Sequence, residues 1–404
     1  MKTNYFEILS VLFIVIISII TFYVLKLIFK KDNLAKDLAK DLAKAKDERA
    51  AWTPPPPIST PAPEVCNPII SKFNLKKSWK GKEMKPSANP DDDKSDWKFF
   101  VGVDPTHGHI IYDAWDYLVN AYEDSLRIDV DLIPMGNGRR SVRLITKDTF
   151  TTINNSSLLF IIDAEHIPEG LSVWPAFWLA NLPSDLTLNK YQIRAWACGG
   201  EIDIIEGCNS IESDNDSNIN LSSLHTNYVD GKPDCIQSGV YGISNVRCDS
   251  SSSDLYTCGC NGNERCPNLG CGQKAGLFGN AFNKNGGGVY ACKLDSDGTV
   301  TIWSFLRNTI PNDILCDKPT PDNWTTQHSF VTFNSCPGHF KDLTLIVNTT
   351  ICGEWAGNVF KSDTDSITTT PSERLLACEA FSVDRKNFYN DAYWCINYVK
   401  VFEK

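Results

Sequence analysis

The apolar residues of this chain change their spacing from one region to the next, and the first region is continuous. Residues 8–25 carry no charge, and only Ser10, Ser18 and Thr21 interrupt the apolar run. As a helix this run would span about 27 Å, enough to cross the hydrocarbon layer of a bilayer. A cleaved signal peptide would have a shorter apolar region, about 7–15 residues, and a small-residue cleavage site after it. The lysines that follow offer no such site, so we predict a membrane anchor within residues 1–31.

The next region is polar and repetitive. Leu34, Leu38 and Leu42 recur every four residues, and aspartates are followed by lysines three positions later. This pattern indicates a solvated helix whose apolar stripe is too thin for a core, either a stalk or a weakly self-associating coil. The prolines of Thr53–Pro63 then favour an extended spacer. We interpret residues 32–64 as a helical stalk with a Pro-rich linker.

From Trp97 onward the apolar residues alternate with polar ones in short runs separated by Gly, Asn, Asp, Pro and Ser. Such runs, rich in β-branched and aromatic residues, predict strands, and no long helical pattern lies between them. We therefore expect residues 65–404 to form one all-β domain, an antiparallel β-jelly-roll sandwich. A propeller or solenoid is not expected, because the region has no repeat of 20–50 residues.

Charge separates the two parts of the chain. Residues 1–52 contain nine Lys or Arg and six Asp or Glu, whereas the rest contains 30 and 43, a net charge of −13. An acidic body argues against a nucleic-acid partner, which would require clustered basic residues. The composition carries no signal for an oligomeric state.

The 15 cysteines, all from Cys66 onward, indicate an oxidising compartment. Because their number is odd, at least one thiol is free or pairs outside the chain. Six Asn-x-Ser/Thr sequons point to the same compartment; they begin at Asn154, Asn155, Asn215, Asn220, Asn323 and Asn348. The lysines after the apolar run favour the opposite, cytoplasmic orientation under the positive-inside rule. We give the cysteines more weight and predict a single-pass membrane protein whose body is extracytoplasmic.

The most informative segment is Gly199–Gly207, with the sequence GGEIDIIEG. On a strand, Glu201 and Asp203 face one side while Ile202 faces the core. Strict alternation would place Glu206 in the core, where an isolated carboxylate is costly. A β-bulge between Asp203 and Glu206 would return Glu206 to the acidic face. Carboxyl groups about 5–5.5 Å apart suit cleavage of a glycosidic bond with retention of configuration.

Tryptophans supply a second part of the candidate site. Trp174 and Trp178 share one face of a predicted strand, and Trp196 lies five residues before Glu201. Indoles stack on sugar rings and donate their N–H to hydroxyl groups. Any single one of these residues is equally well explained as a core tryptophan. Several tryptophans beside a strand that carries carboxylates favour a surface on which sugar rings stack.

The segments VWPAFWL (173–179), GGEIDIIEG (199–207) and LHT (224–226) resemble glycoside hydrolase family 16, in its fungal-type endo-1,3(4)-β-glucanase, laminarinase-like branch. Further matching segments, from DPTHG at 104–108 to YWCINYVKVF at 393–402, extend the resemblance over nearly the whole body. It implies a jelly roll with the acids on its concave face. It also implies roles for six residues: Glu201 as nucleophile, Asp203 as its assistant and Glu206 as acid/base, with Trp178, Trp196 and His225 binding substrate. Trp174 is the seventh candidate, a substrate-binding residue from its place among the tryptophans beside the acid strand.

Three features depart from the family pattern or compete with it. Gly170-Leu171-Ser172 stands where the family often has Gly-Cys-Gly, and residues 181–195 and 211–220 are longer than the family pattern.

Four cysteines between 258 and 271 have a spacing close to that of a zinc knuckle, but they lack paired C-x-x-C turns, so we favour disulfides. Cys198 and Cys208 flank the acid strand and lie too far apart to bridge each other.

Together these features predict a membrane-anchored, retaining endo-β-glucanase that acts on β-1,3-glucan or mixed β-1,3/1,4-glucan. No organic cofactor or metal is expected; the resemblance allows a structural Ca²⁺, for which the sequence holds no ligand cluster. A glucan transglycosylase that remodels a cell wall is the alternative within the same mechanism. A non-catalytic glucan-binding protein or a structural surface protein would leave the three acids unexplained.

Overall fold

The computed structural model describes most of the body of the protein. The described residues are Lys36, Lys40, Ala43, Cys66 and 69–404, except 88, 90–93, 137, 154, 183–199, 226, 227, 230, 231, 234–270, 325–328, 362–369 and 385–388. Lys36, Lys40 and Ala43 are helical and exposed. The predicted anchor at residues 8–25 and the Pro-rich linker lie outside the described residues. Within the described part, no helix has the length and apolar character needed to cross a membrane.

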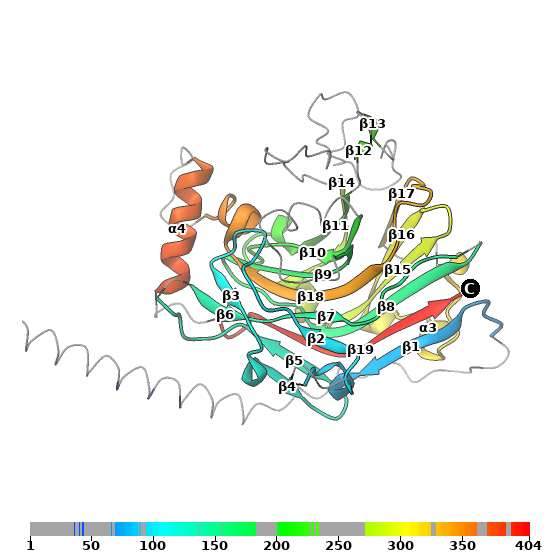
Figure 1. Ribbon diagram of the computed structural model, residues 1–404, viewed down its shortest axis with the longest axis horizontal. Helices are drawn as coiled ribbons and strands as arrows, with labels where there is room; N and C mark the ends of the chain where they lie inside the picture. Colours follow the sequence, from blue (N-terminus) through cyan, green and yellow to red (C-terminus); the bar gives the residue numbers. More distant parts are fainter. Residues whose placement is uncertain are drawn as a thin grey trace, which may run out of the picture. The chain divides into compact units, whose positions relative to one another are not determined.

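The first of two large antiparallel sheets contains eight described strands in the order β17-β16-β15-β8-β19-β5-β4, with β1 paired to β19 (Figure 1). The long C-terminal strand joins β5, β8 and β1. The bounds are β1 (Asn74–Lys80), β4 (Val119–Ala121), β5 (Leu126–Asp129), β8 (Ser157–His166), β15 (Gly288–Asp295), β16 (Val300–Leu306), β17 (Ser329–Phe333) and β19 (Tyr393–Glu403).

The second sheet has seven described strands in the order β14-β11-β10-β9-β18-β7-β2. The strand with the predicted acids, β10, therefore lies between β9 and β11. The bounds are β2 (Trp97–Phe99), β7 (Arg143–Thr146), β9 (Val173–Asn181), β10 (Glu201–Glu206), β11 (Ile219–His225), β14 (Cys271–Leu277) and β18 (Leu343–Ile351).

Shorter elements connect and cover the sheets. Two strand pairs stand apart, β3 (Ile110–Tyr112) with β6 (Arg139–Ser141) and β12 (Tyr228–Val229) with β13 (Lys232–Pro233). The helices with described bounds are η1 (Gly81–Met84), η2 (Asp116–Leu118), η4 (Asp216–Asn218), α2 (Gly279–Lys284), η5 (Arg307–Thr309), α3 (Asn312–Leu315), η6 (Pro321–Asn323), the π-helix η7 (Gly353–Gly357) and α4 (Pro371–Val383). Among these, α4 is the longest, and it begins with a capping box in which Thr370 and Glu373 exchange hydrogen bonds.

Alternation along β9 fixes the two faces of the second sheet. Phe177 and Leu179 are buried between the sheets, where they meet residues of β8 such as Phe160. Burying each such side chain contributes about 1.5–3 kcal/mol. Ala176 and Trp178 point to the opposite face and belong to a second apolar cluster that includes residues of β3, β18 and α4. We call this side the outer face. The predicted all-β antiparallel sandwich is confirmed.

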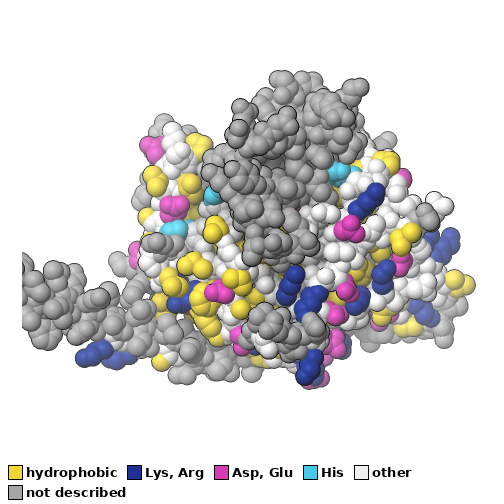
Figure 2. All heavy atoms as spheres, viewed as in Figure 1, with side chains coloured by type: hydrophobic (Ala, Val, Ile, Leu, Met, Phe, Trp, Pro, Cys, Tyr) yellow, Lys and Arg dark blue, Asp and Glu magenta, His cyan; other side chains and the backbone are white. Residues whose placement is uncertain are grey.

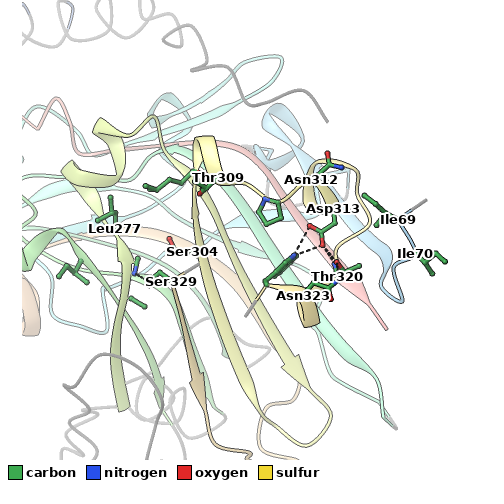
Figure 3. A pocket seen from close by; sticks show the side chains of 16 residues that line it. Ile69, Ile70, Leu277, Ser304, Thr309, Asn312, Asp313, Thr320, Asn323 and Ser329 are labelled. Atoms are coloured by element: carbon green, nitrogen blue, oxygen red, sulfur yellow. Dashed lines mark hydrogen bonds between the residues drawn. The ribbon is translucent and has the colours of Figure 1, made fainter. Parts of the chain in front are cut away.

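Two surface features lie away from β10. Figure 2 shows basic and acidic side chains interspersed on the visible face. Ion pairs on the surface of the described part include Lys77–Asp148 and Lys76–Glu403. A groove of about 1110 Å³ runs past β14, β16 and α3 (Figure 3). Its one buried acid, Asp313, accepts hydrogen bonds from Trp324 Nε1 and from the backbone of Thr320. Since that carboxylate is already satisfied, the groove offers no reactive acid.

Candidate active site

A β-bulge in β10 decides where its acidic side chains point. Asp203 pairs with Trp178 of β9, but Ile205 pairs with Phe177, so the register shifts between Asp203 and Ile205. Ile204 and Ile205 are consecutive residues, and both are fully buried between the sheets. The predicted bulge is confirmed, and its effect is to place two successive apolar side chains in the core.

The bulge returns Glu206 to the outer face of the second sheet. On β9, the partners of Glu201, Asp203 and Glu206 are Ala180, Trp178 and Ala176, and all three of these belong to the outer-face cluster. The three carboxylates therefore share one side of β10, as alternation with one extra residue requires.

Glycines close both ends of this strand because no side chain fits there. Gly200 has φ +92°, and a Cβ on it would lie 2.8 Å from Phe340. A Cβ on Gly207 would lie 2.5 Å from Phe278. Close packing of the second sheet against these two rings thus accounts for the glycines on either side of the acid motif.

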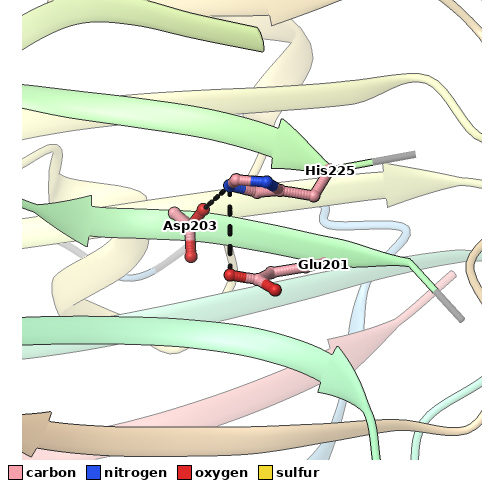
Figure 4. Close-up of side chains that lie close together, drawn as sticks. All are labelled: Glu201, Asp203 and His225. Carbon is pink, nitrogen blue, oxygen red and sulfur yellow. Dashed lines mark ion pairs between the residues drawn. The ribbon is translucent and has the colours of Figure 1, made fainter. Parts of the chain in front are cut away.

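His225 completes a compact group with the first two acids. It lies directly opposite Glu201 in the pairing of β11 with β10. Its Nε2 is 3.1 Å from Asp203 Oδ2 and 3.9 Å from Glu201 Oε1 (Figure 4). Ser223 Oγ donates a hydrogen bond to Asp203 Oδ2, at 2.7 Å. The structure thus brings three of the seven predicted site residues, Glu201, Asp203 and His225, into one compact cluster.

The same group has the composition of a metal site. One ligand atom from each of Glu201, Asp203 and His225 lies within 4.8 Å of the others. Two carboxylates and an imidazole suit a divalent transition metal such as Zn²⁺. They equally suit acid-base and nucleophilic chemistry.

Glu206 has a different environment from the other two acids. Trp174 Nε1 donates a hydrogen bond to Glu206 Oε1 at 2.8 Å. Burial, followed by the negative charge of Asp203, raises the pKa of Glu206 well above its ordinary value, although the bond from Trp174 opposes the rise. A carboxyl group whose pKa is raised in this way is suited to act as a general acid.

The indole N–H groups of two predicted tryptophans bind protein side chains. Trp178 is only 4% exposed, and its Nε1 donates to Asn348 Oδ1 at 2.7 Å. The guanidinium of Arg143 lies 4.7 Å from the centre of its ring. Trp174 donates to Glu206. That Trp174 and Trp178 bind substrate stays a prediction. Trp196 lies outside the described residues.

Trp355 is a neighbour of the site to which the sequence analysis gave no role. Its ring meets that of Trp174 edge to face, with centroids 5.6 Å apart and an interplanar angle of 84°. It belongs to the π-helix η7, and the disulfide Cys352–Cys378 ties the start of η7 to α4. Trp355 lies between residues 104 and 402, where the sequence resembles the family, but only the fold brings it next to Trp174.

A buried chain of hydrogen bonds lies beneath Trp178. Asn348, which accepts from Trp178, donates to the hydroxyl of Tyr112 at 3.0 Å. That hydroxyl lies 2.8 Å from Thr350 Oγ1, which donates to Asp104 Oδ2 at 2.9 Å. Asp104 comes from the DPTHG segment, so this motif has a structural role in joining its loop to β18.

The described cysteines include both disulfides and free thiols. Two complete bridges are described, Cys66–Cys316 and Cys352–Cys378. Three described cysteines are free and buried: Cys208, Cys292 and Cys395. Cys208, at the end of β10, is therefore a free thiol and does not fasten the strand through a disulfide. The proposed zinc or disulfide cluster falls outside the described residues, apart from the backbone of Cys271.

Two of the six sequons are incompatible with a glycan in the folded protein. Asn220 is completely buried and Asn348 is 9% exposed, and both side-chain amides donate hydrogen bonds. Asn155, Asn215 and Asn323 are exposed. These two buried sequons therefore give no support to an extracytoplasmic location of the body.

Comparison with protein families gives a match over most of this fold. Residues 97–402 match the model of the XgeA-like, catalytic GH16 domain. A probable endo-1,3(4)-beta-glucanase of Aspergillus fumigatus is 33% identical over 346 residues, which cover 82% of this chain and 45% of the relative. The endo-1,3(4)-beta-glucanase xgeA of Emericella nidulans is 29% identical, over 82% of this chain and 48% of the relative. The chain thus spans about half the length of these relatives.

Solved structures with the same fold agree. An elongating GH family 16 beta-1,3-glucosyltransferase is 28% identical with a TM-score of 0.57, over 82% of this chain and 100% of the other. Laminarinase 16A from Phanerochaete chrysosporium, solved with beta-glucans in its donor and acceptor sites, is 28% identical with a TM-score of 0.56, over 82% of this chain and 99% of the other.

Proposed function

Because this chain belongs to glycoside hydrolase family 16, we propose that it is a retaining endo-β-glucanase that hydrolyses β-1,3-glucan or mixed β-1,3/1,4-glucan. One observation carries the proposal: a bulge gives β10 three carboxylates on one face, and one of them, Glu206, accepts a hydrogen bond from an indole and has a pKa raised well above its ordinary value. Two environments for two glutamates support two different roles.

In the first step Glu206 is the acid and Glu201 the nucleophile. Glu206 transfers its proton to the glycosidic oxygen while a carboxylate oxygen of Glu201 attacks the anomeric carbon. The C–O bond to the leaving sugar breaks, and a glycosyl ester to Glu201 forms. His225 and Asp203 lie beside Glu201, and the short distances from His225 Nε2 to both carboxylates support a fixed orientation for the nucleophile.

In the second step the roles reverse. Glu206, now a carboxylate, removes a proton from water as the water oxygen attacks the anomeric carbon. The ester bond to Glu201 breaks, which restores the carboxylate of Glu201 and the proton of Glu206. Two inversions at one carbon give a product with the original β-configuration.

The test is incubation with laminarin and with lichenan, followed by product analysis. We expect oligosaccharides from the wild type and none above background from Glu201→Gln or Glu206→Gln. NMR of the first product should show the β-anomer, and an α-anomer would refute double displacement. A protein that binds laminarin and releases nothing would instead be the non-catalytic glucan-binding alternative.

A transglycosylase is the second candidate, supported by the likeness to a GH family 16 beta-1,3-glucosyltransferase. It would share both steps but pass the glycosyl group to a sugar hydroxyl in place of water. A labelled laminari-oligosaccharide added to the same incubation separates the two. Label in products longer than the acceptor supports transfer, and label that stays in the acceptor supports hydrolysis.

We also propose that residues 8–25 anchor the protein and that the body lies outside the cytosol. The disulfides Cys66–Cys316 and Cys352–Cys378 support the second point. Sodium carbonate extraction and protease protection of intact vesicles test both. We further propose that catalysis requires no organic cofactor and no metal, so activity should be unchanged after dialysis against EDTA.

A further inference from the structure

The backbone ladder between β10 and β11 stops before the bulge. Glu201, Ile202 and Asp203 pair with residues of β11, and no pairing with that strand continues from Ile204 to Glu206. The bulge therefore leaves backbone groups of β10 without a backbone partner on this side. Buried groups of this kind require another partner, since an unsatisfied one costs about 1–3 kcal/mol.

The side chain of Asn220 takes the place of the missing backbone pairing. Its Oδ1 accepts the N–H of Glu206 at 3.0 Å, and its Nδ2 donates to the carbonyl oxygen of Ile204 at 3.0 Å. One side-chain amide thus bonds to the backbone on both sides of Ile205. Asn220 is completely buried, so water does not substitute for these bonds.

The surroundings of Asn220 reinforce this arrangement. Ser222 Oγ donates a further hydrogen bond to Ile204 O at 3.0 Å, and Asn220 Nδ2 also reaches Ser222 Oγ at 3.0 Å. On its other edge β11 changes register against β14 between Ile219 and Leu221, next to Asn220. An irregularity on β11 therefore faces the irregularity on β10.

We propose that Asn220 is a positioning residue for the acid/base glutamate, holding the backbone of Glu206 where its carboxyl group meets the glycosidic oxygen. This inference rests on the proposed function. Asn220 touches neither substrate nor the carboxyl group itself. The ionisable groups that face this carboxyl are Asp203, Glu201 and His225, and Trp174 donates to it from β9. A shift of about 1 Å in the acid relative to these groups costs on the order of 100-fold in rate.

The test compares Asn220→Ala with Asn218→Ala on two substrates. Asn218 is a matched control because it is also buried, and its amide bonds to Ile211, Asp214 and Ser210 instead of to β10. The substrates are laminarin, whose leaving sugar needs a proton, and 2,4-dinitrophenyl β-laminaribioside, whose leaving group needs none. The ratio kcat/KM reports on the first step, formation of the glycosyl ester. A misplaced acid therefore lowers kcat/KM on laminarin, whose leaving sugar needs a proton, and leaves kcat/KM on the dinitrophenyl substrate nearly unchanged.

We expect Asn220→Ala to lower kcat/KM on laminarin by about 100-fold, within the range of general acid catalysis, and on the dinitrophenyl substrate by less than about fivefold. Asn218→Ala should reduce both equally or not at all. Equal losses on the two substrates for Asn220→Ala would overturn the inference. If the wild type and Asn218→Ala release nothing from laminarin, the proposed function fails instead.

Two further variants keep the test decisive if Asn220→Ala does not fold. Ser222→Ala removes one bond to Ile204 O, so it should show the same selectivity at a smaller scale. Asn220→Asp restores donor and acceptor together only when the new carboxyl group is protonated. Its activity on laminarin relative to wild type should therefore rise as the pH falls, and a ratio independent of pH would contradict the positioning role.

Discussion

Trp174 and Glu206 are joined by a 2.8 Å hydrogen bond from the indole Nε1 to the carboxylate. The two residues lie on adjacent strands, and the bulge brings Glu206 opposite Ala176, two residues from Trp174 along β9. The bond favours the ionised carboxylate, whereas burial and the charge of Asp203 favour the protonated form. The indole therefore limits how far the pKa of Glu206 rises.

Trp174→Phe should move the alkaline limb of the kcat/KM profile to higher pH. Without the N–H donor, the pKa of Glu206 rises further, and the acid stays protonated over a wider range. A hydrogen bond to a charged group contributes about 1.5–3 kcal/mol. Its loss should therefore lower kcat/KM on laminarin by no more than about 100-fold. Trp355→Phe is the control, because Trp355 contacts Trp174 only through its ring. A limb that moves to lower pH would contradict the assignment.

Glu206→Gln should make the protein more stable at neutral and alkaline pH. Folding raises the pKa of Glu206 above its ordinary value of 4.5, so the folded state binds this proton more tightly than the unfolded state. The resulting stability is complete below pH 4.5 and is lost as the pH rises through the folded pKa. A neutral amide removes that loss, so the difference in Tm between variant and wild type should increase with pH.

The control for this measurement is Glu212→Gln. Glu212 is exposed, and its hydrogen bond and ion pair with Lys284 lower its pKa, which is the opposite shift. Its replacement should bring no gain in Tm at high pH. A stability difference for Glu206→Gln that is the same at pH 4 and pH 8 would show that the pKa is not raised by folding.

Glycans on protein secreted from a glycosylating host should be confined to exposed sequons. Among the described asparagines these are Asn155, Asn215 and Asn323, whereas Asn220 and Asn348 should be unmodified. A glycan on Asn220 would break its hydrogen bonds to the backbone of β10, and one on Asn348 would break the hydrogen bonds beneath Trp178. Mass spectrometry of peptides after enzymatic deglycosylation in heavy-oxygen water counts each site. Modification of Asn220 in active enzyme would contradict the buried bonds described for it.

Local rules were sufficient to predict the acid strand. The alternation of Glu201, Ile202 and Asp203, together with the cost of burying Glu206, predicts one extra residue before Glu206, and the structure has it. The same reasoning identified the outward face of β9 from Trp174 and Trp178. Both inferences depend only on neighbours along the chain and on the two-residue period of a strand.

The partners of these residues depend on pairing between distant strands, which one sequence does not specify. Trp178 donates to Asn348, 170 positions later, because β18 lies beside β9. Trp355 reaches Trp174 for the same reason, through the helix that follows β18. Asn220 was recognised only as a sequon, since its role requires knowing that it faces the bulge.

Azide should distinguish the roles of the two glutamates by the configuration of the product. In Glu201→Ala, azide can enter the space of the missing carboxylate and attack the anomeric carbon directly, with one inversion. With 2,4-dinitrophenyl β-laminaribioside as substrate, the product should be the α-glycosyl azide. In Glu206→Ala the ester to Glu201 still forms, and azide then attacks it without needing a base. Two inversions give the β-glycosyl azide, together with a faster turnover.

On laminarin, Glu206→Ala should lose about 10²–10⁴-fold in kcat. The Asn218→Ala variant, with both glutamates in place, should show no acceleration by azide. An α-azide from Glu206→Ala, or a β-azide from Glu201→Ala, would require the assignment of nucleophile and acid/base to be exchanged.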